Sequence, residues 1–240
     1  MLILWLRFKV YLMTRIKSQV SVSYYKTIAK PSEGFYRDRG SKFYAYMRTI
    51  KSVEDVRVYL EEISNLHPKA RHICYAYRLE SDGSDFRIND DGEPSGSAGR
   101  PIFNELLSSE ITFVLAAVVR YFGGTKLGIP GLIAAYKGAT KEAINGVQII
   151  KVVPKVHLHI DYRIQDMGKL YDLLKRQGVH IEDSLFDPSP KIVAIVPEHS
   201  SFEDRRRILA EFHGYSIDDI DEHFESDQIQ IAIGMISEIK

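Results

Sequence analysis

The stretches D-D-G-E-P-S-G-S-A-G-R-P (residues 90–101) and V-V-R-Y-F-G-G-T-K-L-G (residues 118–128) set the organisation of this chain. Seven of its sixteen glycines fall between Gly92 and Gly131. Glycine lets the backbone adopt positive φ and approach a neighbour closely. We therefore expect this region to contain backbone turns with positive φ or close backbone contacts.

A buried strand and a helix are predicted on either side of the second glycine group. Residues 111–122 form a nearly unbroken apolar run, typical of a strand buried on both faces, with Arg120 as its one charge. Pro130 lies near the first turn of the helix and Gly146 follows its last turn. The buried helix face is predicted from the spacing of Leu132, Ala135, Tyr136, Ala139 and Ala143.

A strand, a glycine turn and a helix start can together present backbone N–H groups to an anion, and Lys126 lies within this turn. Neither the phosphate loop G-x-x-x-x-G-K-[ST] nor the dinucleotide motif G-x-G-x-x-G is present. On physical grounds alone, the glycines fit equally well a tight turn with close helix packing.

Several motifs make the chain resemble the YigZ/IMPACT family over residues 20–235. Besides the two stretches above, they are G-L-I-A-A-Y-K-G-A (131–139), G-S-K-F-Y-A (40–45) and H-I-C-Y-A-Y (72–77). The resemblance implies an α+β protein. Its N-terminal domain would be similar to a ribosomal small-subunit protein and to domain four of elongation factor G, and its C-terminal domain would be ferredoxin-like. It also implies a link to translation, because eukaryotic relatives compete for the activator of a stress kinase that acts on initiation factor two.

Length and composition fit two ordinary domains. The 240 residues are 45% hydrophobic, which is ample for a core in each. The 32 basic residues balance the 32 acidic ones, so RNA contact would need a local patch. The single cysteine, Cys74, excludes an intramolecular disulfide and a thiolate zinc site and favours a reducing compartment. We expect a cytoplasmic protein without a cofactor or metal.

The domain boundaries are predicted at residues 13 and 153. The first residues are apolar, but Arg7 and Lys9 interrupt them, and the segment is too short to span a bilayer. We expect a non-core extension over 1–13, with an interfacial anchor as the alternative, and no membrane partner. The IMPACT-type domain is predicted over 14–153 and the ferredoxin-like domain over 154–240.

A small basic cluster comes before a strand predicted over residues 43–50. It follows residues 31–34, whose proline and glycine interrupt the preceding strand pattern. Its neighbours are aromatic, so it could contact phosphates and stack on bases, or it could be a solvated turn. The residues concerned are Arg37, Arg39 and Lys42, beside Phe35, Tyr36 and Phe43.

Residues 52–66 have the pattern of a helix. Ser52 and Asp55 have the spacing of a capping box, and Pro68 follows the helix. Its buried stripe is predicted from Val53, Val56, Leu60 and Ile63.

The strand predicted over residues 70–79 places His72 and Cys74 on one face. Alternate residues of a strand lie about 6.5 to 7 Å apart at the backbone, which is loose for a thiol and its base. A packed thiol beside a hydrogen-bonded histidine is therefore favoured over a catalytic pair.

Residues 80–99 are polar, rich in glycine and acidic. Their carboxylates could bind a hard cation such as Mg²⁺, although they miss the calcium-loop pattern. They could instead bond N–H groups at the start of a short helix over 101–107, with Asp91 or Glu93 holding Arg100 and Arg120. This carboxylate and guanidinium cluster is the candidate cleft, and a structural salt-bridge cluster is its alternative. The acids are Asp82, Asp85, Asp90, Asp91 and Glu93.

The C-terminal part has the order β-α-β-β-α-β, the pattern of a ferredoxin-like domain. Strands are predicted over 156–162, 179–186, 192–196 and 229–236, with a helix after the first and a helix after the third. The basic run Arg205 to Arg207 fits a solvated helix face, or a surface contact.

Three functional hypotheses follow. The first is a non-enzymatic, translation-associated regulator that binds RNA, the ribosome or a translation-factor partner. The second is an enzyme acting on a phosphorylated small molecule at the glycine turn, for which no nucleophile, base and orienting residue can be assembled. The third is a protein-only regulatory module. No catalytic residue is assigned, and Lys137 and Lys141 extend the cationic set. The candidate binding residues are Lys42, His72, Asp90, Asp91, Glu93, Ser95, Arg100, Arg120, Gly123, Gly124 and Lys126.

Overall fold

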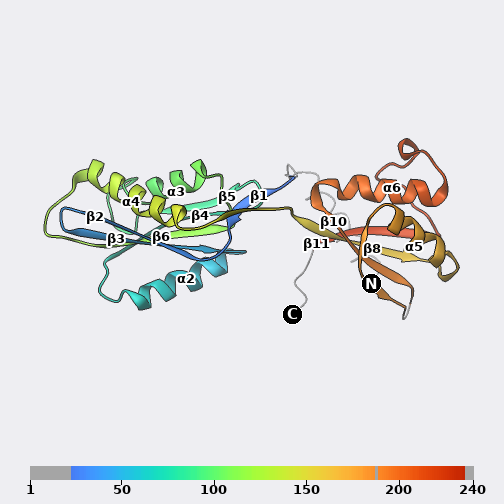
Figure 1. The fold of residues 1–240 in the computed structure, drawn as a ribbon, viewed down its shortest axis with the longest axis horizontal. Coiled ribbons are helices and arrows are strands. Elements are labelled where there is room, and N and C mark those ends of the chain that lie inside the picture. Colours follow the sequence, from blue (N-terminus) through green and yellow to red (C-terminus); the bar gives the residue numbers. More distant parts are fainter. Residues whose placement is uncertain (1–22, 187–188, 236–240) are drawn as a thin grey trace. The chain divides into compact units, whose positions relative to one another are not determined.

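The computed structural model describes residues 23–186 and 189–235. The chain divides into two compact units, Tyr24–Val152 and a second that begins at Val153. Each unit combines antiparallel sheets with helices, so the predicted α+β class is confirmed (Figure 1). Within the described ranges, no helix has the length and apolar character needed to cross a bilayer.

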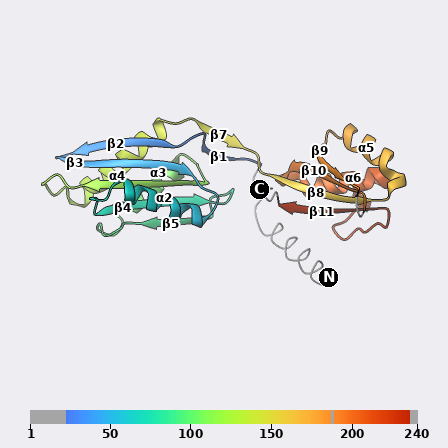
Figure 2. The same cartoon turned by 90° about the horizontal axis from the view of Figure 1, so that it is seen from below.

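The N-terminal unit is built on a five-stranded antiparallel sheet in the order β2-β3-β6-β4-β5. A separate pair of antiparallel strands, β1 (Tyr25–Ile28) and β7 (Ile149–Val152), lies side by side in Figure 2. The five strands are β2 (Ser32–Asp38), β3 (Ser41–Thr49), β4 (His72–Leu79), β5 (Asp85–Asn89) and β6 (Val114–Tyr121).

Strand β6 is the central strand of the five, and its apolar run is covered on both faces. Residues 114–119 are all buried, as the continuous apolar pattern predicts. The helix α2 (Val53–Leu66) covers one face, while α3 (Gly99–Ser108) and α4 (Gly128–Asn145) cover the other (Figure 1). The predicted capping box at the start of α2 is confirmed, since Ser52 and Asp55 bond each other's backbone N–H.

Glycine allows α4 to lie directly on strand β2. A Cβ on Gly34 would come within 2.4 Å of the backbone oxygen of Ala139, and a Cβ on Gly138 within 2.7 Å of the Tyr36 ring. Neither position has room for a side chain. Close helix packing is therefore one reason for the glycines in this domain.

Two strands were not predicted from the sequence. The residues of β2 were interpreted as an interruption of the strand pattern followed by a basic turn, and those of β5 as part of a polar loop. Both are edge strands of the sheet, so half of their backbone groups need no partner strand and their side chains are largely polar. A composition of polar and charged residues, with Gly34 in β2, is compatible with such edges.

The C-terminal unit has the predicted β-α-β-β-α-β order. Its antiparallel sheet has the order β11-β8-β10-β9, the arrangement of a ferredoxin-like domain (Figure 2). The elements are β8 (Lys155–Tyr162), α5 (Met167–Arg176), β9 (His180–Leu185), β10 (Lys191–Pro197), α6 (Ser201–His213) and β11 (Ile229–Met235).

Two of the three arginines in the basic run on α6 are not solvated, which corrects the prediction for them, whereas Arg207 is exposed and pairs with Asp204 at 3.4 Å. Arg205 is 5% exposed and donates to the backbone oxygens of Ile231 and Phe224. Arg206 donates to the oxygens of Ile220 and Ile217. These guanidinium groups satisfy carbonyl groups of β11 and of the segment that leads into it, so their role is structural.

Candidate functional site

The site forms where two glycine turns touch, one between β2 and β3 and one after β6. The backbone N–H of Gly123 donates to Ser41 Oγ at 3.1 Å. A Cβ on Gly123 would come within 1.9 Å of the carbonyl carbon of Gly40, which itself has a φ of 80°. Only glycine permits this contact, because both turns meet at backbone distance.

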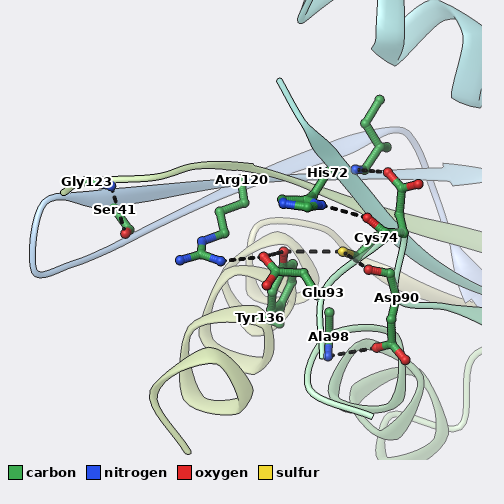
Figure 3. Close-up of polar contacts among 11 residues, drawn as sticks. Ser41, His72, Cys74, Asp90, Glu93, Ala98, Arg120, Gly123 and Tyr136 are labelled. Carbon is green, nitrogen blue, oxygen red and sulfur yellow. Dashed lines mark hydrogen bonds and ion pairs between the residues drawn. The ribbon is translucent and has the colours of Figure 1, made fainter. Parts of the chain in front are cut away.

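An ion pair is buried directly behind these turns (Figure 3). Arg120 Nη1 lies 2.6 Å from Glu93 Oε1, and the two side chains are 10% and 4% exposed. The same carboxylate oxygen accepts a hydrogen bond of 2.9 Å from the Tyr136 hydroxyl. The ring of Phe43 lies 5.7 Å from the guanidinium. A buried pair with these extra contacts joins the loop before α3 to β6 and α4.

The thiol of Cys74 belongs to the same buried group. Its Sγ lies 3.3 Å from the Tyr136 hydroxyl and 3.0 Å from the backbone oxygen of Asp90. Burial raises the pKa of Cys74 to about 12, and burial likewise raises the pKa of Tyr136. Both groups therefore stay protonated near neutral pH and act as hydrogen-bond donors.

His72 shares the sheet face of Cys74 but bonds elsewhere. Its Nδ1 lies 2.7 Å from the backbone oxygen of Asp91. A thiol without thiolate character and a histidine bonded to the backbone do not form a nucleophile and base. The arrangement is the packed thiol and hydrogen-bonded histidine that the strand spacing favoured.

The two adjacent aspartates bond backbone groups. The Asp90 carboxylate accepts N–H bonds from Gly96, Ala98 and Gly99, at 2.8, 3.0 and 2.8 Å, and so caps the start of α3. Asp91 Oδ2 accepts the backbone N–H of Ile73 at 2.6 Å. Asp90 thus acts at the helix start, which was one of the two interpretations of these acids.

The candidate residues separate into a clustered set and a solvent-exposed set. Glu93 and Arg120 form the buried ion pair of Figure 3, and partly buried His72 and Asp90 lie beside it together with exposed Asp91; we call these five residues the buried cluster. The predicted pairing of Arg100 with Asp91 or Glu93 is wrong, because Arg100 is exposed and its guanidinium lies 5.8 Å from the Phe103 ring. The solvent-exposed set consists of Lys42, Ser95, Arg100, Gly123, Gly124 and Lys126.

The acids of residues 80–99 do not gather around one point. Asp82 Oδ1 accepts the N–H of Ser84, and Asp85 begins β5. Across residues 23–186 and 189–235, no group of three or more His, Cys, Asp or Glu side chains is placed to hold a metal ion.

A set of aromatic side chains lies on the other face of the sheet, on the side of α2, and of this set only Phe35 was predicted from the sequence as a possible stacking residue. Phe43 and Tyr36, assigned to the basic cluster from sequence, instead face α4: Phe43 is buried and Tyr36 packs against Gly138. The period-two alternation of β3 could have identified Tyr44 and Tyr46 as outward-facing residues, whereas His67 after α2 and Tyr121 of β6 join them through the fold. The full set is Phe35, Tyr44, Tyr46, His67 and Tyr121, which we call the aromatic surface.

Comparison with known proteins identifies the family. The Impact N-terminal domain matches residues 39–144. An IMPACT family member of Thermus thermophilus is 31% identical over 157 residues, which are 65% of this chain and 84% of that relative. This chain belongs to the IMPACT family. Among other IMPACT family members, YvyE of Bacillus subtilis is 28% identical over 176 residues, 72% of this chain and 80% of YvyE.

The IMPACT family resemblance predicted from the motifs is therefore confirmed. YigZ of Escherichia coli is 34% identical over 116 residues, which are 48% of this chain and 57% of YigZ. A crystal structure described as a hypothetical protein shares 25% identity and a TM-score of 0.60, covering 90% of this chain and 99% of its own. The matched Impact domain contains both glycine turns and the buried cluster.

Proposed function

We propose that this IMPACT family member is a non-enzymatic, cytoplasmic regulator of translation that binds RNA, free or within the ribosome, through the basic end of its N-terminal unit. The basic end is defined as Arg37, Lys42 and Lys126, which flank the touching glycine turns. All three are exposed, and none has a carboxylate within ion-pair distance in the described part of the chain.

The observation that carries the proposal is the pairing of Arg37 and Lys42. The register of β2 and β3 places these two residues directly opposite each other. Like charges at opposite positions of an antiparallel pair destabilise the sheet. A bound phosphate group would relieve that repulsion, and Lys126 in the neighbouring turn adds a third cation for a phosphate chain.

The buried cluster supports binding over catalysis. The thiol and phenol beside it have raised pKa values, its aspartates bond backbone N–H groups, and its arginine is paired with Glu93. The side chains that could take part in catalysis are therefore already bonded within the protein, where they hold the loop before α3 in place. Apart from Asp91 and Ser95, the candidate residues left facing solvent are cations and glycines, which suit contact with a polyanion.

The test is binding of purified protein to small ribosomal subunits and to naked ribosomal RNA over a range of salt concentrations. Neutralising about three phosphates gives a slope of about −2 in log affinity against log salt. The double variant Arg37→Glu/Lys42→Glu should weaken binding and flatten that slope, whereas Lys175→Glu, an exposed lysine of the C-terminal unit, should not. Ribonuclease-resistant capture of a protein, with no RNA affinity at low salt, would contradict the proposal.

A further inference from the structure

The sheet of the N-terminal unit has one face that its helices cover only in part. On β3, the side chains of Phe43, Ala45 and Met47 point into the core and are fully buried. The alternate residues, including Tyr44 and Tyr46, are partly exposed on the α2 side. At the edge of this face, Phe35 of β2 is 49% exposed.

The aromatic surface on this face is held in a defined arrangement. The ring centroids of Phe35 and Tyr44 are 5.0 Å apart, and those of Tyr44 and Tyr121 are 6.0 Å apart. His67 is fixed between two hydroxyls, with Tyr46 at 2.6 Å and Tyr121 at 2.9 Å. Because both ring nitrogens are engaged, the imidazole and the two tyrosines restrain one another.

Cations border the aromatic surface on two sides. Along one row of the sheet, Lys42 lies between Arg37 and Tyr121. Lys69 and Arg71 are exposed in the segment that follows His67. Like Arg37 and Lys42, they make no ion pair with a carboxylate in the described residues.

Acidic side chains near this surface are fewer. Glu33 is exposed on the same face, opposite Tyr46. Arg48 is paired with Glu62 at 2.9 Å and adds no free charge. The surface therefore combines neighbouring aromatic rings, tilted or edge-on to one another, with an excess of positive charge.

Aromatic rings beside unpaired cations match the chemistry of a single-stranded nucleic acid. Unpaired bases offer flat faces to stack on rings, while the backbone phosphates contact the cations. A duplex keeps its bases stacked inside and presents only phosphates and grooves. An apolar protein partner would match the rings but would leave four cations without counterions.

We infer that the aromatic surface stacks on bases of unpaired RNA whose phosphates lie along Arg37 and Lys42. The inference rests on the proposed function, since the basic end supplies the phosphate contacts. It adds a preference: the protein binds single-stranded segments such as loops and tails over duplex RNA. Phe35, the most exposed ring, is the stacking residue whose loss has the largest effect with the least risk to the fold.

The test uses a single-stranded RNA of about 12 nucleotides carrying 2-aminopurine, with the same sequence annealed to its complement as the duplex probe. Anisotropy of an end label measures affinity, and 2-aminopurine fluorescence falls when the base stacks on a ring. Phe35→Ala should lower affinity for the single strand by about tenfold and remove the fluorescence change, while Phe35→Trp keeps both. Affinity for the duplex should not change.

The chain contains a matched control for this substitution. Phe86 of β5 is also 49% exposed and lies on an edge strand, where it packs against Phe103 at 4.7 Å. Phe86→Ala removes the same exposed ring away from the aromatic surface, so its affinity for the single strand should stay within about twofold of wild type.

The outcomes separate the two proposals. Equal affinity of wild type for single strand and duplex, with no difference between Phe35→Ala and Phe86→Ala, overturns the stacking surface and leaves phosphate binding at the basic end intact. Absence of RNA binding by the wild type at low salt overturns both. A Phe35→Ala variant that alters only self-association, measured by light scattering, also overturns the stacking surface.

Discussion

Glu93 and Arg120 form a hydrogen-bonded ion pair of 2.6 Å between a loop and the central strand, and both side chains are almost withdrawn from solvent. This pair anchors the glycine-rich loop that caps α3 and lies next to the turn at Gly123. The buried cluster therefore stabilises the part of the N-terminal unit that carries the exposed basic end.

Removing the negative charge of this pair should destabilise the N-terminal unit strongly. Glu93→Gln leaves Arg120 charged and buried without a counterion, and breaking a buried pair costs about 3 to 5 kcal/mol. Urea denaturation of wild type and variant measures the loss. Glu110→Gln, which breaks the exposed ion pair with Lys26, is the control and should cost far less. Equal losses from the two variants would mean that the buried pair has no special role.

The contact between the two turns should tolerate no side chain. Gly123→Ala would place a methyl group within 1.9 Å of Gly40, and such overpacking costs about 1 to 3 kcal/mol. A methyl group on Gly168 in α5 would meet no atom within 4 Å, so Gly168→Ala should raise helix stability by up to about 1 kcal/mol. Thermal denaturation of both variants provides the comparison. A stable Gly123→Ala variant would show that the turns separate freely.

The thiol of Cys74 should make stability fall in alkaline solution. Its pKa is raised from the ordinary 9.0 to about 12 by burial, so the folded state holds a proton that the unfolded state releases between these values. The contribution of this group to the free energy of unfolding is fully present below pH 9.0 and is lost as the pH rises from 9.0 to about 12. Unfolding free energies at several alkaline pH values should decline more steeply for wild type than for Cys74→Ala. Parallel declines would exclude the thiol as the source.

His67 should contribute the opposite pH dependence. Burial lowers its pKa below 6.5, although nearby Glu33 opposes this shift. The unfolded chain then binds a proton before the folded chain does, so stability is complete above pH 6.5 and is lost as the pH falls. His67→Gln should lose less stability on acidification than wild type. NMR titration of the imidazole gives the direct check, and a pKa above 6.5 would contradict this assignment.

Elements that depend on local pattern were predictable from the sequence. The continuous apolar run of β6, the capping box at Ser52 and the β-α-β-β-α-β order each follow from local rules, and all three are present. Edge strands β2 and β5 were missed because one backbone edge and one face of such a strand can be polar, which removes the apolar signal.

Partners of individual charges were less predictable, because they depend on contacts distant in sequence. The segment around Asp91 suggested that Arg100 and Arg120 share one site, yet α3 turns Arg100 outward to Phe103 while β6 carries Arg120 to Glu93. Similarly, Arg205 is held by carbonyl groups of residues 224 and 231. Sequence composition identifies such charges without showing whether each meets solvent or a buried partner.

Ultraviolet crosslinking in living cells, followed by mass spectrometry of the crosslinked peptides, tests the central claim most directly. Stacked aromatic residues crosslink readily to bases, so the account predicts RNA attached to peptides that contain Phe35, Tyr44 or Tyr121, with the signal lost in Arg37→Glu/Lys42→Glu. Crosslinks confined to the C-terminal unit, or an absence of RNA from the purified protein, would contradict it.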